Sequence, residues 1–335
     1  MASILSLKRP EIAIDFGTAN VRVISRDDGI VFDEPSLCCF SRDLGVIGLV
    51  AAGTEAHAMI DRTPSNLYIK RPICRGVLQD MEAAKGVLRY AVSRAIGKTR
   101  MRAPTAIMGV PADATQAERA ALLTAANDAG IGGVKLVMEP LAAAIGAELP
   151  VAAPTGSMII ECGAGTTEVA VFALGGICEV GAVRIGGATL DRTIADRLHL
   201  HHKFLIGDLT AEQLKLEYVA RRQVGAGAIS EVISVKGRCL RRGLPKSIGV
   251  ELSELDRLVE KHVEQIVRVV REVLGRTAPE LSQDIHDNGV VLTGGGALTP
   301  LMSAMIGDAT GLNVRVADQP KQCVANGLHQ LLQAG

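Results

Sequence analysis

The sequence predicts an α/β protein built from two related halves. Short β-branched runs alternate with longer amphipathic stretches of helical periodicity, which is the pattern of an α/β chain. A strand–acid–turn–strand segment occurs twice, as IAIDFGTANVRV at 12–23 and as IIECGAGTTEVAV at 159–171. A chain of 335 residues is long enough for roughly two domains. Two similar halves predict a cleft between them, and ligands often bind in such clefts.

The composition argues against several classes of function. Lys plus Arg and Asp plus Glu both number 36, so the chain has no net charge that would attract a polyanion. Aromatic residues make up only 2% of the chain, and without base-stacking platforms we expect no nucleic acid partner. Seven scattered cysteines without a CxxC pair indicate reduced thiols and a cytoplasmic protein. A net charge near zero also favours self-association.

Two helices can be placed from the spacing of their apolar residues. The first is expected between Asp80, which can cap its start, and Gly97, which can end it. The second follows Ser253 and is expected to stop at Gly275. We interpret both apolar stripes as faces buried in the core.

Both hairpin turns fit a phosphate group. Backbone N–H donors in a turn without bulky side chains can approach a phosphate closely. The residues expected to contact phosphate are Gly17, Thr18, Ala19 and Asn20 in the first turn and Gly163, Ala164, Gly165 and Thr166 in the second. Asp15 and Glu161 stand two residues upstream, where each carboxylate would hold a hydrated Mg²⁺. Glycine in a hairpin is also explained by positive φ alone, so a single hairpin leaves both interpretations open.

A third glycine-rich segment supports a nucleotide site. A strand that starts at Gly289 leads into Gly294, Gly295, Gly296 and Ala297, and we expect this turn to lie flat against a ligand. A helix is expected to follow, with Thr299 at its N-cap and Pro300 at its first position. The spacings of the Rossmann and P-loop motifs are absent, which argues against a dinucleotide enzyme and a P-loop ATPase.

The three segments resemble, in order, the first phosphate, second phosphate and adenosine motifs of the actin and sugar-kinase superfamily. Further segments narrow the resemblance to MreB-type (MreB/Mbl) bacterial actins, among them GIVFDEPS (29–36), RPICRGVLQD (71–80), GVPADATQAERAAL (109–122), MEPLAAAIGAELPV (138–151) and VKGRCLRRGLP (235–245). The resemblance spans nearly the whole chain. It implies an actin-like ATPase fold, in which two ribonuclease-H-like domains enclose a nucleotide cleft and each carries a small subdomain.

The resemblance also implies domain boundaries and a cellular context. Domain I is expected at 1–150 plus about 315–335, with a small subdomain at about 33–70, and domain II at 151–314, with a small subdomain at about 188–250. The implied protein binds ATP or GTP with Mg²⁺ and assembles into filaments, usually as paired protofilaments. It would lie in the cytoplasm or at the inner face of the cytoplasmic membrane, with membrane-bound morphogenetic partners. It would serve cell-shape maintenance or intracellular positioning.

Individual roles follow from the same resemblance. Glu118 would orient the attacking water, although Thr115 to Glu118 also has the pattern of a helix capping box. Thr167 would face the terminal phosphate or that water. Glu212 and Lys215 would lie beside the ribose and adenine, although a Glu and a Lys three residues apart can equally form a solvated surface pair. The predicted catalytic residues are therefore Asp15, Glu118, Glu161 and Thr167.

Two residues depart from the pattern of similar proteins. The position of Glu161 is normally Asp, and Ala164 replaces the middle one of three glycines. Hydrated Mg²⁺ demands near-ideal octahedral geometry, so a carboxylate that is one methylene longer displaces the metal or its waters. We therefore hypothesise that nucleotide binding is retained while hydrolysis is slowed.

Four other segments carry weaker signals. ILSLKR at 4–9 is interpreted as a frayed tail rather than an amphipathic anchor, and the loop 97–104 matches the family's membrane-inserting loop with only Met101 as an apolar tip. HLHH at 199–202 is interpreted as a solvated helix end rather than a metal site. The basic cluster at 236–246 lacks aromatic residues and is interpreted as a solvated hairpin or a filament contact.

Three classes of function remain. The ordered match over the whole chain favours a filament subunit that uses ATP as an assembly switch. A small-molecule kinase would need a substrate-binding insertion and a catalytic base near the first hairpin, and neither is recognisable. A heat-shock-type chaperone would need a substrate domain for which this chain leaves no room. A monomeric actin-fold ATPase or a small-molecule kinase is the alternative to a filament subunit.

Overall fold

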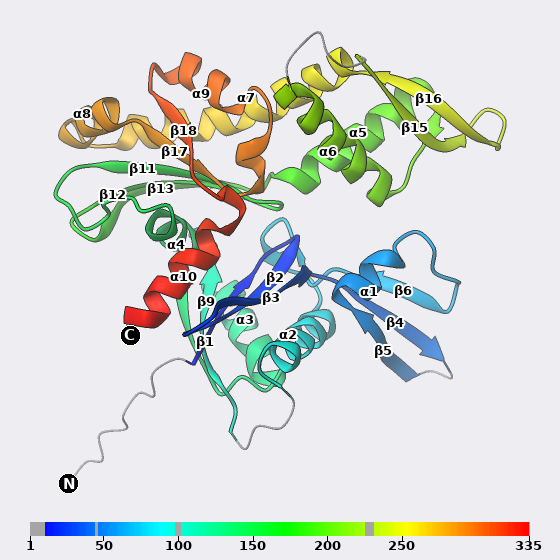
Figure 1. Cartoon of the computed structure of the whole chain (residues 1–335), viewed down its shortest axis with the longest axis horizontal. Coiled ribbons are helices and arrows are strands. Elements are labelled where there is room, and N and C mark those ends of the chain that lie inside the picture. The colour runs from blue at the N-terminus through cyan, green and yellow to red at the C-terminus, as the bar shows by residue number, and fades with distance from the viewer. Residues whose placement is uncertain (1–10, 44–45, 98–101, 225–230, 335) are drawn as a thin grey trace. The chain divides into compact units, whose positions relative to one another are not determined.

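The computed structural model describes residues 11–43, 46–97, 102–224 and 231–334 (Figure 1). The segment 4–9 and residues 98–101 of the loop matched to a membrane-inserting loop lie outside the described residues. No helix in the described part is both long enough and apolar enough to cross a membrane. The chain divides into two units: unit 1 is Met1–Met59, Pro64–Leu149 and Gln322–Gly335, and unit 2 is Ile60–Thr63 and Pro150–Lys321.

The central sheet of unit 1 has five strands in the order β10-β9-β1-β2-β3. Its strands are β1 (Ile12–Phe16), β2 (Asn20–Ser25), β3 (Gly29–Pro35), β9 (Thr105–Val110) and β10 (Gly133–Met138). The first three strands form an antiparallel meander, and β9 and β10 run parallel to β1. All five residues of β1 are buried, as expected for a strand covered on both faces.

The central sheet of unit 2 repeats this arrangement in the order β13-β12-β11-β17-β18. Its strands are β11 (Ser157–Cys162), β12 (Thr167–Ala173), β13 (Gly176–Val183), β17 (Val290–Thr293) and β18 (Val314–Val316). Again three antiparallel strands are followed by two that run parallel to the first. The two related halves predicted from the repeated hairpin are thereby confirmed. Because β18 completes this sheet, unit 2 continues past residue 314, where the sequence-based boundary lay.

Helices cover both faces of the sheet in unit 1. They are α2 (Met81–Ile96), α3 (Gln116–Asp128), α4 (Glu139–Gly146) and α10 (Cys323–Ala334), the last preceded by the short 3-10 turn η2 (Pro320–Gln322). The expected ends of α2 are confirmed: the carboxylate of Asp80 accepts the N–H of Ala83 at 2.8 Å, and Gly97 ends the helix with a φ of 80°. Buried residues of α4 and α10 form one apolar cluster with Ala13, Ile24 and Ile107 of the sheet.

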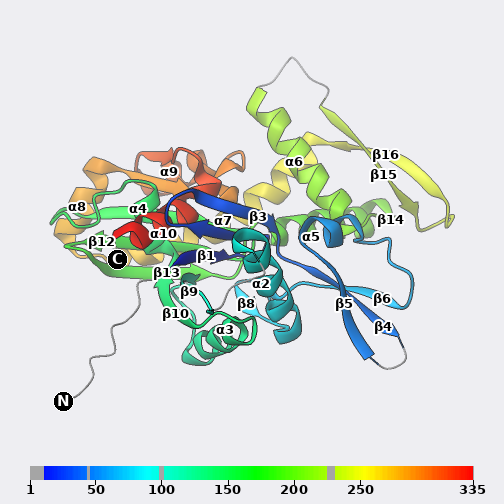
Figure 2. The same cartoon turned by 60° about the horizontal axis from the view of Figure 1, so that its bottom comes forward.

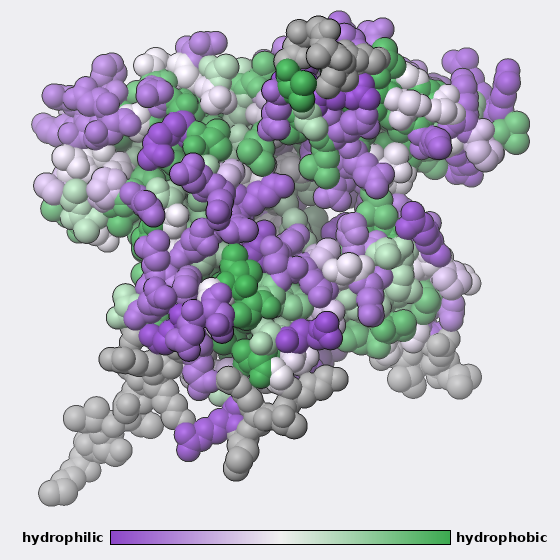
Figure 3. Space-filling view, in the orientation of Figure 1, coloured by the Kyte–Doolittle hydropathy of each residue, from purple (hydrophilic) through white to green (hydrophobic). Residues whose placement is uncertain are grey.

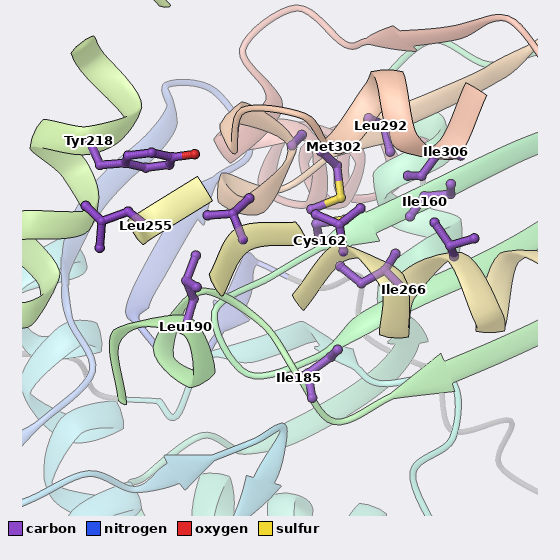
Figure 4. Packing of buried hydrophobic residues seen from close by; sticks show 14 of the residues in the cluster. Ile160, Cys162, Ile185, Leu190, Tyr218, Leu255, Ile266, Leu292, Met302 and Ile306 are labelled. Atoms are coloured by element: carbon purple, nitrogen blue, oxygen red, sulfur yellow. The ribbon is translucent and has the colours of Figure 1, made fainter. Parts of the chain in front are cut away.

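The helices of unit 2 pack with its central sheet in one apolar cluster. They are α5 (Gly187–His202), α6 (Asp208–Val224), α7 (Leu252–Arg276), α8 (Pro279–Asn288) and α9 (Met302–Thr310). Figure 4 shows Ile160 and Cys162 of β11 packed with Ile266 of α7 and Met302 of α9. The apolar stripe predicted after Ser253 is therefore a core face, although α7 starts at Leu252 and continues through Gly275 to Arg276.

One predicted helix start is wrong. Thr299 was expected at an N-cap and Pro300 at the first helical position. Instead Gly295–Leu298 forms the 3-10 turn η1, and the N–H of Thr299 closes it by donating to the carbonyl of Gly296 at 2.9 Å. The helix α9 begins only at Met302, after Leu301 in a left-handed conformation with a φ of 67°.

Each unit also carries a smaller three-stranded sheet. In unit 1 it is formed by β4 (Cys38–Asp43), β5 (Val46–Ala52) and β6 (Leu67–Lys70), beside the short helix α1 (Gly53–Ala58). The two-stranded hairpin of β7 (Ile73–Cys74) and β8 (Val77–Leu78) leads from it to α2. In unit 2 the sheet consists of β14 (Phe204–Leu205), β15 (Val232–Cys239) and β16 (Pro245–Glu251), packed against α5 and α6 (Figure 2).

The helices α4 and α10 touch each other through two glycines. A Cβ on Gly146 would lie 2.6 Å from the amide nitrogen of Gly327 and would overlap the carbonyl oxygen of Cys323. A Cβ on Gly327 would lie 2.6 Å from the carbonyl carbon of Ala142. Real side chains do not approach so closely, so the crossing of these helices requires glycine at both positions.

We predict that Gly327→Ala lowers the free energy of unfolding by about 1–3 kcal/mol, because the added methyl group overlaps backbone atoms that cannot move aside. Gly275→Ala is the control: it adds the same methyl group to α7 where no atom lies within 4 Å. That variant should gain up to about 1 kcal/mol from the higher helix propensity of alanine. Urea denaturation followed by circular dichroism measures both, and equal losses in the two variants would contradict this packing.

Candidate functional site

The two hairpin turns have nearly the same backbone geometry. In the first, the N–H of Gly17 donates to the carbonyl of Asn20, and in the second the N–H of Gly163 donates to the carbonyl of Thr166, both at 2.9 Å. A Cβ on Gly17 would lie 3.1 Å from the Asn20 oxygen, and a Cβ on Gly163 would lie 3.2 Å from the Thr166 oxygen. The same close approach therefore favours glycine at the first position of each turn.

The two-residue loops at the tips of these turns present backbone donors. Within the described part of the chain, the N–H groups of Thr18, Ala19, Ala164 and Gly165 have no backbone acceptor. Adjacent N–H groups of this kind, in turns with small side chains, suit phosphate oxygens. Ala164 is not among the residues with positive φ, so its methyl group causes no backbone strain.

In the first hairpin the buried acid is already paired with a base. Nη1 of Arg22 donates to Oδ2 of Asp15 at 2.8 Å, and Nε of Arg22 donates to Asp33 at 2.9 Å. The side-chain amide of Asn20 also donates to Asp33, at 2.6 Å. Burial raises the pKa of Asp15, and the Arg22 guanidinium works against that shift. A metal ion at Asp15 would therefore compete with the Arg22 guanidinium for this carboxylate.

In the second hairpin the equivalent pair consists of two acids. Asp15 faces Arg22 across the strands of unit 1, whereas Glu161 faces Glu168 across the strands of unit 2. The exposed fractions of these two glutamates are 6% and 0%. Like charges directly opposite each other on a sheet repel, and a divalent cation relieves such repulsion. The residues of the second hairpin therefore fit a hydrated cation better than those of the first.

The glycine turn before α9 lies against the end of β11. Glu161 pairs with Thr293, the last residue of β17, so that Gly294 follows directly beside Cys162. A Cβ on Gly294 would lie 2.6 Å from the carbonyl carbon of Cys162 and 2.7 Å from Oε1 of Glu161. The structure thus brings together the second phosphate turn and the predicted adenosine turn, at one edge of one sheet.

The sequence reasoning missed a second glycine pair at this edge. The N–H of Gly187 donates to the carbonyl of Gly163 at 3.1 Å, and the N–H of Ala188 donates to that of Ala164 at 2.9 Å. A Cβ on Gly186 would lie 2.7 Å from the carbonyl carbon of Ala164. The helix α5 therefore starts directly on the second hairpin turn. The signal was present, because Gly186 and Gly187 follow a strand and precede a helical stripe.

Lys215 lies close to the same turn and is not a solvated surface residue. Its Nζ donates to the carbonyl of Gly187 at 3.2 Å and to Oδ2 of Asp191 at 2.8 Å, and its side chain is only 15% exposed. Burial raises the pKa of Asp191, and the Lys215 charge opposes that shift. Glu212 lies one turn before Lys215 on α6. Lys215 therefore does not form the solvated surface pair with Glu212 that the sequence also allowed.

The two predicted hydrolytic side chains both have protein partners. The hydroxyl of Thr167 donates to the carbonyl of Ile185 at 3.0 Å and is fully buried. Oε2 of Glu118 accepts the N–H of Thr115 at 2.8 Å, and the N–H of Glu118 donates to the Thr115 hydroxyl at 3.2 Å. This is the complete capping box that the local sequence indicated. A role in hydrolysis would require Glu118 to leave or share that box.

A further carboxylate lies near the first turn. Met138 at the end of β10 pairs with Val110, two residues beyond Met108, the partner of Ile14 in β1. Glu139 therefore follows β10 at the level of the turn that follows β1. Carboxyl ends of parallel strands form the usual ligand edge of such sheets. Glu139 has no role predicted from the sequence, because its position depends on the register of three strands.

The remaining signals lie away from these turns. The histidines at 199–202 end α5, as predicted, and Nε2 of His202 lies 3.0 Å from Oε2 of Glu254. The basic segment 236–246 spans the hairpin of β15 and β16, as predicted.

Comparison with known proteins places the chain in a family. The family model described as MreB/Mbl protein matches residues 9–334. The cell shape-determining protein Mbl of Bacillus subtilis (strain 168) is 36% identical over 322 residues, covering 96% of this chain and 95% of Mbl. The cell shape-determining protein MreB of Escherichia coli (strain K12) is 38% identical over 320 residues, covering 95% of this chain and 91% of MreB.

A solved structure agrees with these relatives. The crystal structure of MreB5 of Spiroplasma citri bound to AMPPNP matches with a TM-score of 0.86 and 30% identity, covering 96% of this chain and 95% of MreB5. The same protein bound to ADP also matches with a TM-score of 0.86. The predicted actin-like α/β fold is thereby confirmed. The chain belongs to the MreB/Mbl family of bacterial actin homologues.

Proposed function

We propose that the chain is an ATP-binding cytoskeletal subunit that assembles into filaments and serves cell-shape maintenance or intracellular positioning. The observation that carries the proposal is the pair of matching turns, each of which follows a buried carboxylate and presents backbone N–H donors. The names of Mbl and MreB as cell shape-determining proteins support the cytoskeletal role. The AMPPNP and ADP bound to MreB5 support an adenine nucleotide.

The proposed nucleotide contacts follow from the chemistry of each segment. The turns Gly17 to Asn20 and Gly163 to Thr166 would donate N–H groups to phosphate oxygens. The turn Gly294 to Ala297, with Glu212 and Lys215 of α6, would contact the nucleoside. Asp15 and Glu161 would hold Mg²⁺ through water, and the bound metal would neutralise phosphate charge. A guanine nucleotide in place of adenine is the competing assignment.

The proposed filaments consist of paired protofilaments of this chain. A cytoplasmic location at the inner face of the membrane, with membrane-bound morphogenetic partners, follows from the family resemblance and stays a prediction.

We predict that Glu161→Asp raises the rate of phosphate release by roughly tenfold, a change of about 1.4 kcal/mol in the barrier. The shorter carboxylate would return the metal and its waters to the geometry of similar proteins, because Mg²⁺ tolerates little displacement. Glu179→Asp is the matched control and should leave the rate unchanged, since it shortens a carboxylate on β13 that pairs with Arg276 and belongs to neither turn. Phosphate release is measured under single-turnover conditions with ATP and Mg²⁺.

The same assay distinguishes Glu118 from Glu139, the further carboxylate near the first turn, as the group that orients the attacking water. In the Glu161→Asp background, Glu118→Gln should abolish release if Glu118 leaves its capping box and orients the attacking water, the role that the family resemblance implies. Loss in Glu139→Gln but not in Glu118→Gln would transfer the role to Glu139. A parent chain that already hydrolyses ATP as fast as Glu161→Asp would contradict slowed turnover.

We expect filament assembly to depend on nucleotide. The full chain should sediment at high speed with ATP and Mg²⁺ and appear as filaments by negative-stain electron microscopy. Removal of the metal with EDTA should leave it in the supernatant, because the phosphate charge is then unbalanced. A chain that binds ATP but stays monomeric at all concentrations would favour the monomeric ATPase or kinase instead.

A further inference from the structure

The hairpin of β15 and β16 carries an unusual concentration of positive charge. Between Val232 and Val250 the chain has no Asp or Glu, whereas it has five basic residues: Lys236, Arg238, Arg241, Arg242 and Lys246. All five are exposed. Exposed Lys203, at the end of α5, adds a sixth, because its carbonyl accepts the N–H of Leu240 at 2.8 Å. We call these six residues the basic hairpin cluster.

None of the six forms an ion pair with a carboxylate in the described part of the chain. Elsewhere in the same unit, basic residues such as Arg197 and Arg222 are paired with acids. The cluster therefore keeps its full charge for an external partner. Its field also acts on Cys239, whose thiol pKa is lowered chiefly by the N–H of Arg242 and further by the charges of Lys246 and Arg242.

The tip of the hairpin adds apolar surface to this charge. Leu240 is 39% exposed and Leu244 is 60% exposed. Figure 3 shows hydrophilic surface along the projecting hairpin and a hydrophobic patch at its end. The tip is held in place, because the N–H of Cys239 donates to Leu244 at 2.9 Å and that of Gly243, with a φ of 69°, donates to Cys239 at 2.8 Å. The leucines are thus presented by an ordered turn.

We propose that the tip of this hairpin docks onto an anionic lipid surface. The basic hairpin cluster would contact the headgroups, and Leu240 and Leu244 would enter the apolar boundary beneath them. A nucleic acid or another soluble polyanion would use the charges but not the leucines, and the hairpin offers no aromatic ring for base stacking. The inference does not depend on nucleotide binding, because these residues belong to none of the turns described above.

The first test is flotation of the full chain, without nucleotide, with vesicles of defined composition. We expect binding to phosphatidylcholine vesicles that contain about one third phosphatidylglycerol, and none to pure phosphatidylcholine, since each basic residue near an anionic surface strengthens binding about fivefold. Arg241→Glu with Arg242→Glu should weaken binding by more than about tenfold. The control is Arg257→Glu with Lys261→Glu, an identical charge change at two exposed residues of α7.

A second test follows the leucines directly. The chain contains no Trp, so Leu244→Trp introduces a single fluorophore at the tip. Its emission should shift to shorter wavelength when anionic vesicles are added, because the indole leaves water. Leu123→Trp, at a partly exposed position of α3, should not shift. Leu240→Ser with Leu244→Ser should reduce flotation while leaving the melting temperature of the chain unchanged.

Several outcomes would overturn this proposal. Absence of flotation with anionic vesicles would exclude an anionic lipid surface as the partner of the hairpin. Flotation that survives Arg241→Glu with Arg242→Glu would place membrane binding elsewhere, for example at residues 4–9. Equal losses in the α7 control would show an effect of net charge alone. Loss of sedimentable filaments in the same variants, with unchanged flotation, would make the hairpin a contact between copies of the chain.

Discussion

A short turn that brings two backbone segments within about 3 Å of each other constrains much of this structure. Such a turn is described in each unit, and in both cases glycine is favoured because a Cβ would press against the carbonyl that closes the turn. The strand before each turn is buried on both faces and pairs with both of its neighbours. In unit 2 the neighbouring segments are then obliged to bring glycine as well, at Gly186 and Gly294, so that α5 and the turn after β17 can reach the same edge.

The two hairpins share their backbone geometry but differ in the charges of their buried side chains. The cross-strand partner of the buried acid is Arg22 in unit 1 and Glu168 in unit 2. Asp15 is therefore paired with a base across the strands, while Glu161 lies opposite a second buried acid. Glu161 and Ala164, which the sequence predicts to depart from the family pattern, both lie in this second hairpin. Ala164 is not among the residues with positive φ, so its methyl group, and not backbone strain, distinguishes it from glycine at this position.

Local chemistry made part of this structure predictable. The paired hairpins, the ends of α2 and the core face of α7 follow from short patterns whose physical causes lie within a few residues. The predicted start of α9 was wrong because a Thr-Pro capping pattern competes with the glycine turn before it. The glycines form a 3-10 turn that includes the residues up to Leu298. The level of Glu139 beside the first turn depends on the register of three strands. The bond from Lys215 to Asp191 depends on the packing of two helices. Neither can be derived from spacing in one sequence.

The proposed function depends most directly on phosphate binding by the turn at Ala164. Equilibrium binding of ATP with Mg²⁺, measured by calorimetry, should weaken by at least about tenfold in Ala164→Asp, because a carboxylate beside the N–H donors repels phosphate. Leu174→Asp is the matched variant, at an exposed turn at the other end of β12 where the φ of 53° suits aspartate. It should bind as the parent does. Equal affinity of both variants and the parent would contradict the central claim.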